Sequence, residues 1–233
     1  MWETRQQALA ATESELRTEA TLLDTSLRLL DSAIESVASK SSHDNYASVV
    51  LVTLVKAKHL GLASYSLALD SLGQEAGALA RVWIEALELL RYLALDPTRV
   101  QEVFEQRLPS PGAIGKKIDG QAQTLRSLFN ESASHFSFDV RSVIHIVNPE
   151  TQAVRTAPEF KVHVLRANMT VVYWFLHFTL VEALVAMGVA GIPNEEFASL
   201  VDGLKTIAHD VFPIPYAQQE VLADSSNRNG RPT

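Results

Sequence analysis

The sequence predicts an all-α fold, a single-domain bundle of six or seven helices with one small β-hairpin. Long segments repeat their apolar residues at helical spacing, and clusters of Gly, Pro, Asp and Ser separate these segments. Hydrophobic residues make up 47% of the chain and charged residues 20%, which is typical of a globular protein. Composition is even until the last stretch, so we expect one domain over residues 1–212 and a disordered tail over 213–233.

Residues 4–40 carry a heptad pattern, which predicts one long helix. The positions that recur every seven residues are Leu9, Leu16, Leu23, Leu30 and Val37, with Ala20, Leu27 and Ile34 as a companion series. We expect this helix on the outside of a helical bundle. The alternative is a coiled-coil-like contact between two copies of the chain.

The next two helices are predicted over residues 46–69 and 73–95. Asp44 or Ser42 is suited to cap the first of them. Its apolar residues lie nearly all round the helix, so we expect it in the centre of the bundle. Pro97 prevents a simple continuation of the second helix.

Two shorter helices follow. Asp96 and Pro97 have the order of an N-cap and a proline in the first helical position, so a short helix is expected to about Arg107. The segment 108–115 contains proline and glycine and is expected to be a loop. A further helix is predicted over residues 116–131.

The pattern changes at residues 142–156, where β-branched residues flank a turn sequence that runs from Asn148 to Thr151. This arrangement predicts a small β-hairpin. A two-stranded ribbon is only marginally stable by itself, so we expect the hairpin to lie against the helices.

The longest apolar helix is predicted over residues 158–189, and the last helix over 195–211. The stretch 171–192 approaches the roughly 20 residues that a membrane span needs. It contains His177 and Glu182, and two ionisable groups in a lone span would be costly. We therefore expect the centre of a bundle and no membrane.

Charge and cysteine content narrow the functional classes. A net charge of −7 argues against sequence-independent binding to nucleic-acid backbones, which relies on clustered Lys and Arg. A sequence without cysteine has no disulfide, no thiolate nucleophile and no Cys-ligated zinc. The first residues lack the basic and then apolar order of a secretory signal, so a cytoplasmic protein is expected.

The best candidate for a polar site is a stripe on the predicted helix 73–95. At 100° per residue, Arg81, Glu85, Glu88 and Tyr92 fall on one side of an otherwise apolar helix. The pairs Arg81/Glu85 and Glu88/Arg91 are spaced for ion pairing. The stripe is either a solvated face with weak ion pairs or the wall of an internal cleft.

A second polar stripe lies on the predicted helix 158–189. Its members are His163, Arg166, Thr170, Tyr173 and His177. His163 and His177 are about 21 Å apart along a helix, so they cannot bind one metal ion. Each is expected to be a hydrogen-bonded, partly buried imidazole, with a catalytic role as the alternative. Glu182 is surrounded by apolar residues and is expected to pair with an arginine or to reach the helix edge.

Familiar catalytic motifs are absent from the sequence. No Glu-x-x-His of a di-iron bundle, no His-Glu-x-x-His, no Gly-x-Ser-x-Gly and no dinucleotide fingerprint occurs. The sequence therefore predicts no metal and no cofactor.

Two elements of the sequence carry a resemblance to a known group. The helix with Arg81-Val-Trp-Ile-Glu85 and the later run Leu125-Arg126 to His135 resemble uncharacterised all-helical prokaryotic proteins related to the HEPN-like superfamily, over about residues 46–189. The resemblance implies a helical bundle in which Arg81, Glu85 and His135 meet in one polar pocket. The superfamily includes metal-independent ribonucleases in which four to six residues separate the catalytic arginine from the catalytic histidine. This chain departs from that spacing, because eight residues separate Arg126 from His135.

We predict a non-catalytic binding or regulatory module that forms a homodimer through helix 4–40 or helix 158–189. The expected binding residues are Glu88, Tyr92, Arg126 and His177. The alternative is a HEPN-like metal-independent ribonuclease or nucleotide-processing enzyme of toxin or defence type. Only this alternative expects RNA or a nucleotide as ligand, and its catalytic residues would be Arg81, Glu85 and His135. Without catalysis, His135 would satisfy backbone carbonyls at the C-terminus of a helix.

Overall fold

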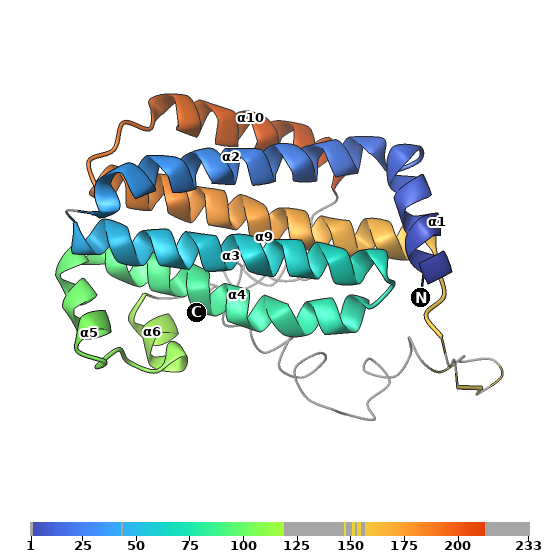
Figure 1. Cartoon of the computed structure of the whole chain (residues 1–233), viewed down its shortest axis with the longest axis horizontal. Helices are drawn as coiled ribbons and strands as arrows, with labels where there is room; N and C mark the ends of the chain where they lie inside the picture. Colours follow the sequence, from blue (N-terminus) through green and yellow to red (C-terminus); the bar gives the residue numbers. More distant parts are fainter. Residues whose placement is uncertain are drawn as a thin grey trace, which may run out of the picture.

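Four long helices lie side by side and form the body of a helical bundle (Figure 1). They are α2 (Arg17–Ser41), α3 (Asn45–Leu69), α4 (Gly73–Leu95) and α9 (Val162–Val189). α3 and α9 each pack against the other three, so both lie in the centre of the bundle. The structure, a computed structural model, describes residues 2–42, 44–118, 147, 151, 153–154 and 157–212. Over these residues it is a single all-α domain.

Shorter helices complete the bundle (Figure 1). α1 (Trp2–Glu13) lies across one end, and α10 (Glu195–Val211) packs on α2 and α9. The 3-10 turn η1 (Pro97–Arg99), α5 (Val100–Phe104) and α6 (Pro111–Lys117) follow α4 at the opposite end. The described residues thus form eight α-helices and one 3-10 turn.

The predicted helix 4–40 is two helices, so that prediction is wrong. A turn at Ser14–Leu16 separates them, and the amide of Leu16 donates to the carbonyl of Ala11 at 2.9 Å. The heptad pattern continued across the turn because Leu16 is fully buried there, as are Leu23 and Leu30 further along α2. The heptad residues of α2 therefore belong to the core of this chain.

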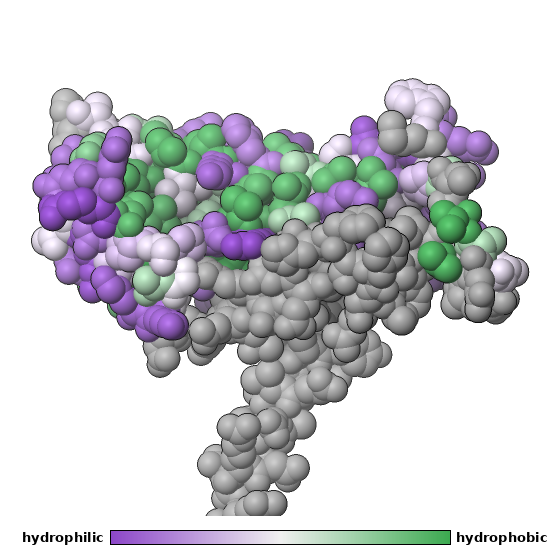
Figure 2. All heavy atoms as spheres, turned by 90° about the horizontal axis from the view of Figure 1, so that it is seen from below, coloured by the Kyte–Doolittle hydropathy of each residue, from purple (hydrophilic) through white to green (hydrophobic). Residues whose placement is uncertain are grey.

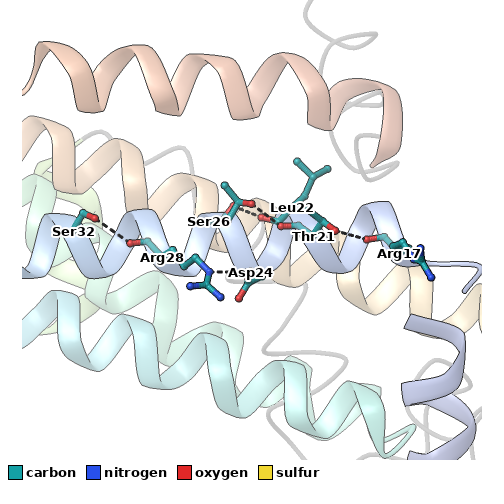
Figure 3. A network of polar contacts seen from close by, with 8 residues as sticks. Arg17, Thr21, Leu22, Asp24, Ser26, Arg28 and Ser32 are labelled. Carbon is teal, nitrogen blue, oxygen red and sulfur yellow. Dashed lines mark hydrogen bonds and ion pairs between the residues drawn. The ribbon is translucent and has the colours of Figure 1, made fainter. Parts of the chain in front are cut away.

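Exposed polar side chains of α2 and the buried Ser26 make contacts within the helix itself (Figure 3). Thr21 and Ser26 donate their hydroxyl hydrogens to carbonyls one turn back, and Arg28 pairs with Asp24 at 2.7 Å. Hydroxyl bonds of this kind satisfy local groups and leave little capacity for a ligand. We therefore assign this network to helix structure.

The caps of α3 and η1 agree with the sequence. Asp44 accepts hydrogen bonds from the amides of Tyr46 and Ala47 at 2.8 and 3.3 Å. Asp96 accepts from the amide of Thr98 at 3.1 Å, with Pro97 in the first helical position. Cap side chains replace the partners that the first helical amides lack. α3 packs against α2, α4 and α9, as expected of a central helix, and it keeps one exposed face.

Other predicted boundaries are corrected. The expected loop 108–115 contains the start of α6 at Pro111, where proline suits the first helical position. Most of the predicted helix 116–131 lies outside the described residues, as does the tail 213–233. Of the predicted hairpin 142–156, the described residues contain an isolated antiparallel bridge between Val147 and Val154 and no strand.

α9 begins at Val162, later than predicted, and α10 has the predicted bounds. α3 and α9 have the length and hydropathy of membrane spans, but 61% of the most apolar window of α9 is buried inside the bundle. Polar bonds also tie α9 to α4, since the indole nitrogen of Trp83 donates to the hydroxyl of Thr179 at 2.9 Å. Packing inside the bundle accounts for the apolar character of α9.

Candidate ligand-binding pocket

The polar stripe of α4 changes from partly exposed to buried along the helix. Arg81 and Glu85 form an ion pair at 3.4 Å, with 42% and 28% of their side chains exposed. One and two turns further on, Glu88 is 5% exposed and Tyr92 is 1% exposed. The interpretation as a solvated face is therefore wrong for the second half of the stripe, which faces into the protein.

A pocket of about 580 Å³ opens beside this stripe, between α3, α4, α5 and α6. Its lining residues are Ser48, Val49, Val52, Thr53, Lys56, Val82, Glu85, Ala86, Glu88, Leu89, Val103, Phe104, Leu108, Pro109, Pro111 and Ile114. Most of these are apolar. Val52 and Phe104 also reach the surface, where they are 69% and 54% exposed. The pocket is open to solvent on one side.

Apolar and hydrophilic surface alternate on the face seen from below in Figure 2. The end that carries α5 in Figure 1 is strongly hydrophilic, and apolar groups follow further along the molecule. The pocket wall formed by Val103, Phe104 and Leu108 comes from this end of the bundle. These apolar lining residues therefore belong to an end of the bundle whose surface is largely hydrophilic in this view.

Three charged side chains line the pocket. Glu85 is paired with Arg81, as described above. The carboxylate of Glu88 lies against α6, where a Cβ atom at Gly115 would be 3.1 Å from its Oε1 atom. Glycine thus allows α6 to approach this carboxylate closely. Lys56 projects from the exposed side of α3.

Tyr92 does not line the pocket, but its contacts hold two of the elements that do. Its hydroxyl donates to Glu102 at 2.9 Å and accepts from Lys117 at 3.4 Å. The guanidinium of Arg99 lies 4.3 Å from the ring centroid and also donates to the carbonyl of Tyr92 at 3.0 Å. Cations over a tyrosine face are stabilising. Tyr92 thereby holds α5 and α6, which form two of the pocket walls.

His177 lies elsewhere, on the side of α9 that faces α10. It is buried, its ring stacks on Tyr173, and Trp174 meets it edge-on. Burial lowers the pKa of His177 to about 4, and the nearby positive charge of Lys205 acts in the same direction. Its Nδ1 atom is buried without a hydrogen-bond partner. The expected hydrogen bond is therefore not made at that nitrogen.

The remaining predicted residues fall into two groups. His135 and Arg126 lie outside the described residues. Glu182 pairs with Arg91 at 2.7 Å, as predicted, although burial still raises its pKa above the usual range. Arg166 pairs with Glu19. Among the described residues, no group of three His, Cys, Asp or Glu side chains could hold a metal ion.

Sequence reasoning missed the walls of the pocket that α3, α5 and α6 supply. Lys56 carried a usable signal, since it is a single charge after a long apolar run in α3. Phe104 and Leu108 carried no such signal. They flank Gln106, whose left-handed backbone (φ 54°) folds the chain back toward α4. Only the folded chain brings these residues together.

No family model, curated protein or solved structure matches this chain.

Proposed function

We propose that the chain is a non-catalytic binding module whose ligand occupies the pocket between α3, α4, α5 and α6. The observation that carries this proposal is a cavity of about 580 Å³ with mostly apolar walls and three charged side chains, Lys56, Glu85 and Glu88. Small-molecule sites are commonly cavities of roughly 300–1,000 Å³ with apolar walls and a few polar groups.

The hydroxyl groups of the pocket support binding over catalysis. Ser48 donates to the carbonyls of Ser41 and Asp44, and Thr53 donates to the carbonyl of Val49. A nucleophilic hydroxyl needs a neighbouring general base to accept its proton. These two hydroxyls give their hydrogens to backbone carbonyls of their own surroundings, and Glu85 is paired with Arg81. These lining groups therefore suit recognition of a ligand by its shape and polarity.

Titration with the apolar dye N-phenyl-1-naphthylamine tests the proposal. The dye should become fluorescent on binding to the purified protein, and Val52→Trp should weaken that binding by narrowing the mouth of the pocket. Leu62→Trp is the matched control, because Leu62 lies on the same helix, is 42% exposed and does not line the pocket. Equal dye binding by all three proteins would reject this pocket as the site.

A homodimer is part of this proposal. The heptad leucines of α2 are buried, so the contact would use large apolar residues that the predicted helices 4–40 and 158–189 still expose, which are Leu9 on α1 and Val164 and Val189 on α9. Sedimentation velocity of Leu9→Asp and Val164→Asp tests it. A monomer in the unmodified chain at high concentration would remove the dimer from the proposal.

The second candidate is the HEPN-like ribonuclease or nucleotide-processing enzyme. The observation that favours it is the Arg81–Glu85 pair, where a partly exposed guanidinium stands next to a carboxylate of the pocket wall. An arginine can stabilise the charge of a phosphate during its transfer. Incubation of a mixed RNA pool without metal, beside Arg81→Ala and His135→Ala, tests it. Cleavage that both substitutions abolish would replace the binding module with this enzyme.

A further inference from the structure

The three charged side chains of the pocket differ in the partners that they have within the chain. Glu85 is paired with Arg81, and Glu88 already interacts within the chain. Lys56 has no carboxylate partner among the described residues, although the neighbouring Lys58 pairs with Asp31. The pocket therefore presents one cation that the described fold does not use.

The surroundings of Lys56 define where a ligand charge would lie. Lys56 comes one turn after Val52 on α3, and both residues line the pocket. Val52 and Lys56 are exposed, whereas Leu89 and Ile114 on the opposite walls are more buried. A lysine side chain can lay its methylene groups along apolar surface and keep its ammonium group in water. The charged end of a ligand would thus be at the mouth, and its apolar end inside.

We infer that the ligand is a single-chain amphiphile with an anionic head group, such as a long-chain carboxylic acid. Its hydrocarbon chain fills the cavity between α3, α4 and α5, and its head group pairs with Lys56. This inference rests on the proposed function and adds the chemical class of the ligand. A cationic head group would instead compete with Arg81 for Glu85 and repel Lys56.

Displacement of the bound dye by amphiphiles of equal chain length tests the head group. Dodecanoate and dodecylamine are used below their micelle concentrations, and dodecanol below its solubility limit, all at pH 8. Dodecanoate should displace the dye at about a 1.5- to fivefold lower concentration than dodecanol, the effect of one exposed ion pair. Its advantage should shrink in high salt because the pair is exposed.

Variants of Lys56 assign the preference to this residue. Lys56→Gln should make dodecanoate and dodecanol equal, and Lys56→Glu should reverse the order in favour of dodecylamine. Lys58→Gln is the matched control two residues away, since Lys58 does not line the pocket. It should keep the preference for dodecanoate.

The outcomes separate the two proposals. Dye binding that is absent, or that Val52→Trp does not change, rejects the pocket as a binding site and the inference with it. Dye binding in the pocket with equal displacement by all three amphiphiles, or with a preference that Lys56→Gln does not alter, overturns the anionic head group alone.

Discussion

Arg91 and Glu182 join α4 to α9 through a bidentate ion pair. Both Nε and Nη2 of Arg91 donate to the carboxylate, at distances from 2.7 to 3.1 Å. Glu182 is largely buried, and 40% of the Arg91 side chain is exposed. Burial raises the pKa of Glu182, and the bonds from Arg91 only partly oppose that rise. The carboxylate therefore depends on this arginine for its partner.

Arg91→Ala should lower the free energy of unfolding more than a double substitution of both residues. Removal of the arginine leaves a buried carboxylate without its partner, at a cost of about 1–3 kcal/mol, whereas apolar replacement of both partners is often nearly neutral. Urea unfolding of Arg91→Ala and of Arg91→Leu with Glu182→Leu measures the difference. A double variant that is less stable than Arg91→Ala would contradict this prediction and show that the pair itself contributes net stability.

His177 should make the fold less stable in mild acid. Its pKa is about 4 in the folded protein and near 6.5 in an unfolded chain, so the unfolded state binds more protons between these values. Stability is therefore complete above pH 6.5 and falls as the pH decreases toward 4. The expected loss between pH 7 and pH 5 is about 2 kcal/mol by linkage.

Urea unfolding at pH 7 and pH 5 measures the effect of His177. His177→Phe keeps a ring beside Tyr173 and Trp174 and should remove most of this pH dependence. His163→Phe, at an exposed position of the same helix, is the control and should retain it. Identical pH profiles for His177→Phe and the unmodified protein would show that the imidazole is not the responsible group.

Tyr92→Phe should weaken the contacts that hold the pocket walls on α5 and α6 without changing the volume of the pocket. The change removes the hydroxyl that bonds Glu102 and Lys117, and it keeps the ring beneath Arg99. A typical net loss for such a bond is about 0.5–1.5 kcal/mol. Because α5 carries the wall residues Val103 and Phe104, dye affinity should fall as well. Tyr65→Phe, on α3 and outside the pocket lining, is the control, and an equal fall there would remove the special role of Tyr92.

The extent to which the sequence predicts the fold differs between elements. α4 and α10 have the predicted bounds because turn residues and prolines border a clear apolar period. The sequence does not reveal the break before α2, because Leu16 is buried in the turn and keeps the seven-residue apolar spacing although the helix is interrupted there. α6 was missed because glycine is a poor helix former, and Gly115 is tolerated where α6 approaches Glu88.

The candidate site was predictable only on its α4 side. Helical spacing placed Glu85 and Glu88 on one face of the helix, and the structure has both in the pocket wall. Lys56 and Phe104 are 48 residues apart in the sequence, and both line the same pocket. A periodic pattern reports the environment of one helix, so it contains no information on which distant segments meet there.

Gly61 and Gly203 provide opposite tests of the packing. A Cβ atom at Gly61 would be 2.9 Å from Cη2 of Trp83 and 3.1 Å from Cδ2 of Leu176, whereas one at Gly203 would have no neighbour within 4 Å. Gly61→Ala should lower the free energy of unfolding by about 1–3 kcal/mol, because overpacking forces buried side chains to move. Gly203→Ala should raise it by about 0.5–1 kcal/mol through helix propensity alone. Urea unfolding of both variants at pH 7 measures these changes. Stabilisation by Gly61→Ala would mean that α3, α4 and α9 do not approach one another as closely as this arrangement requires.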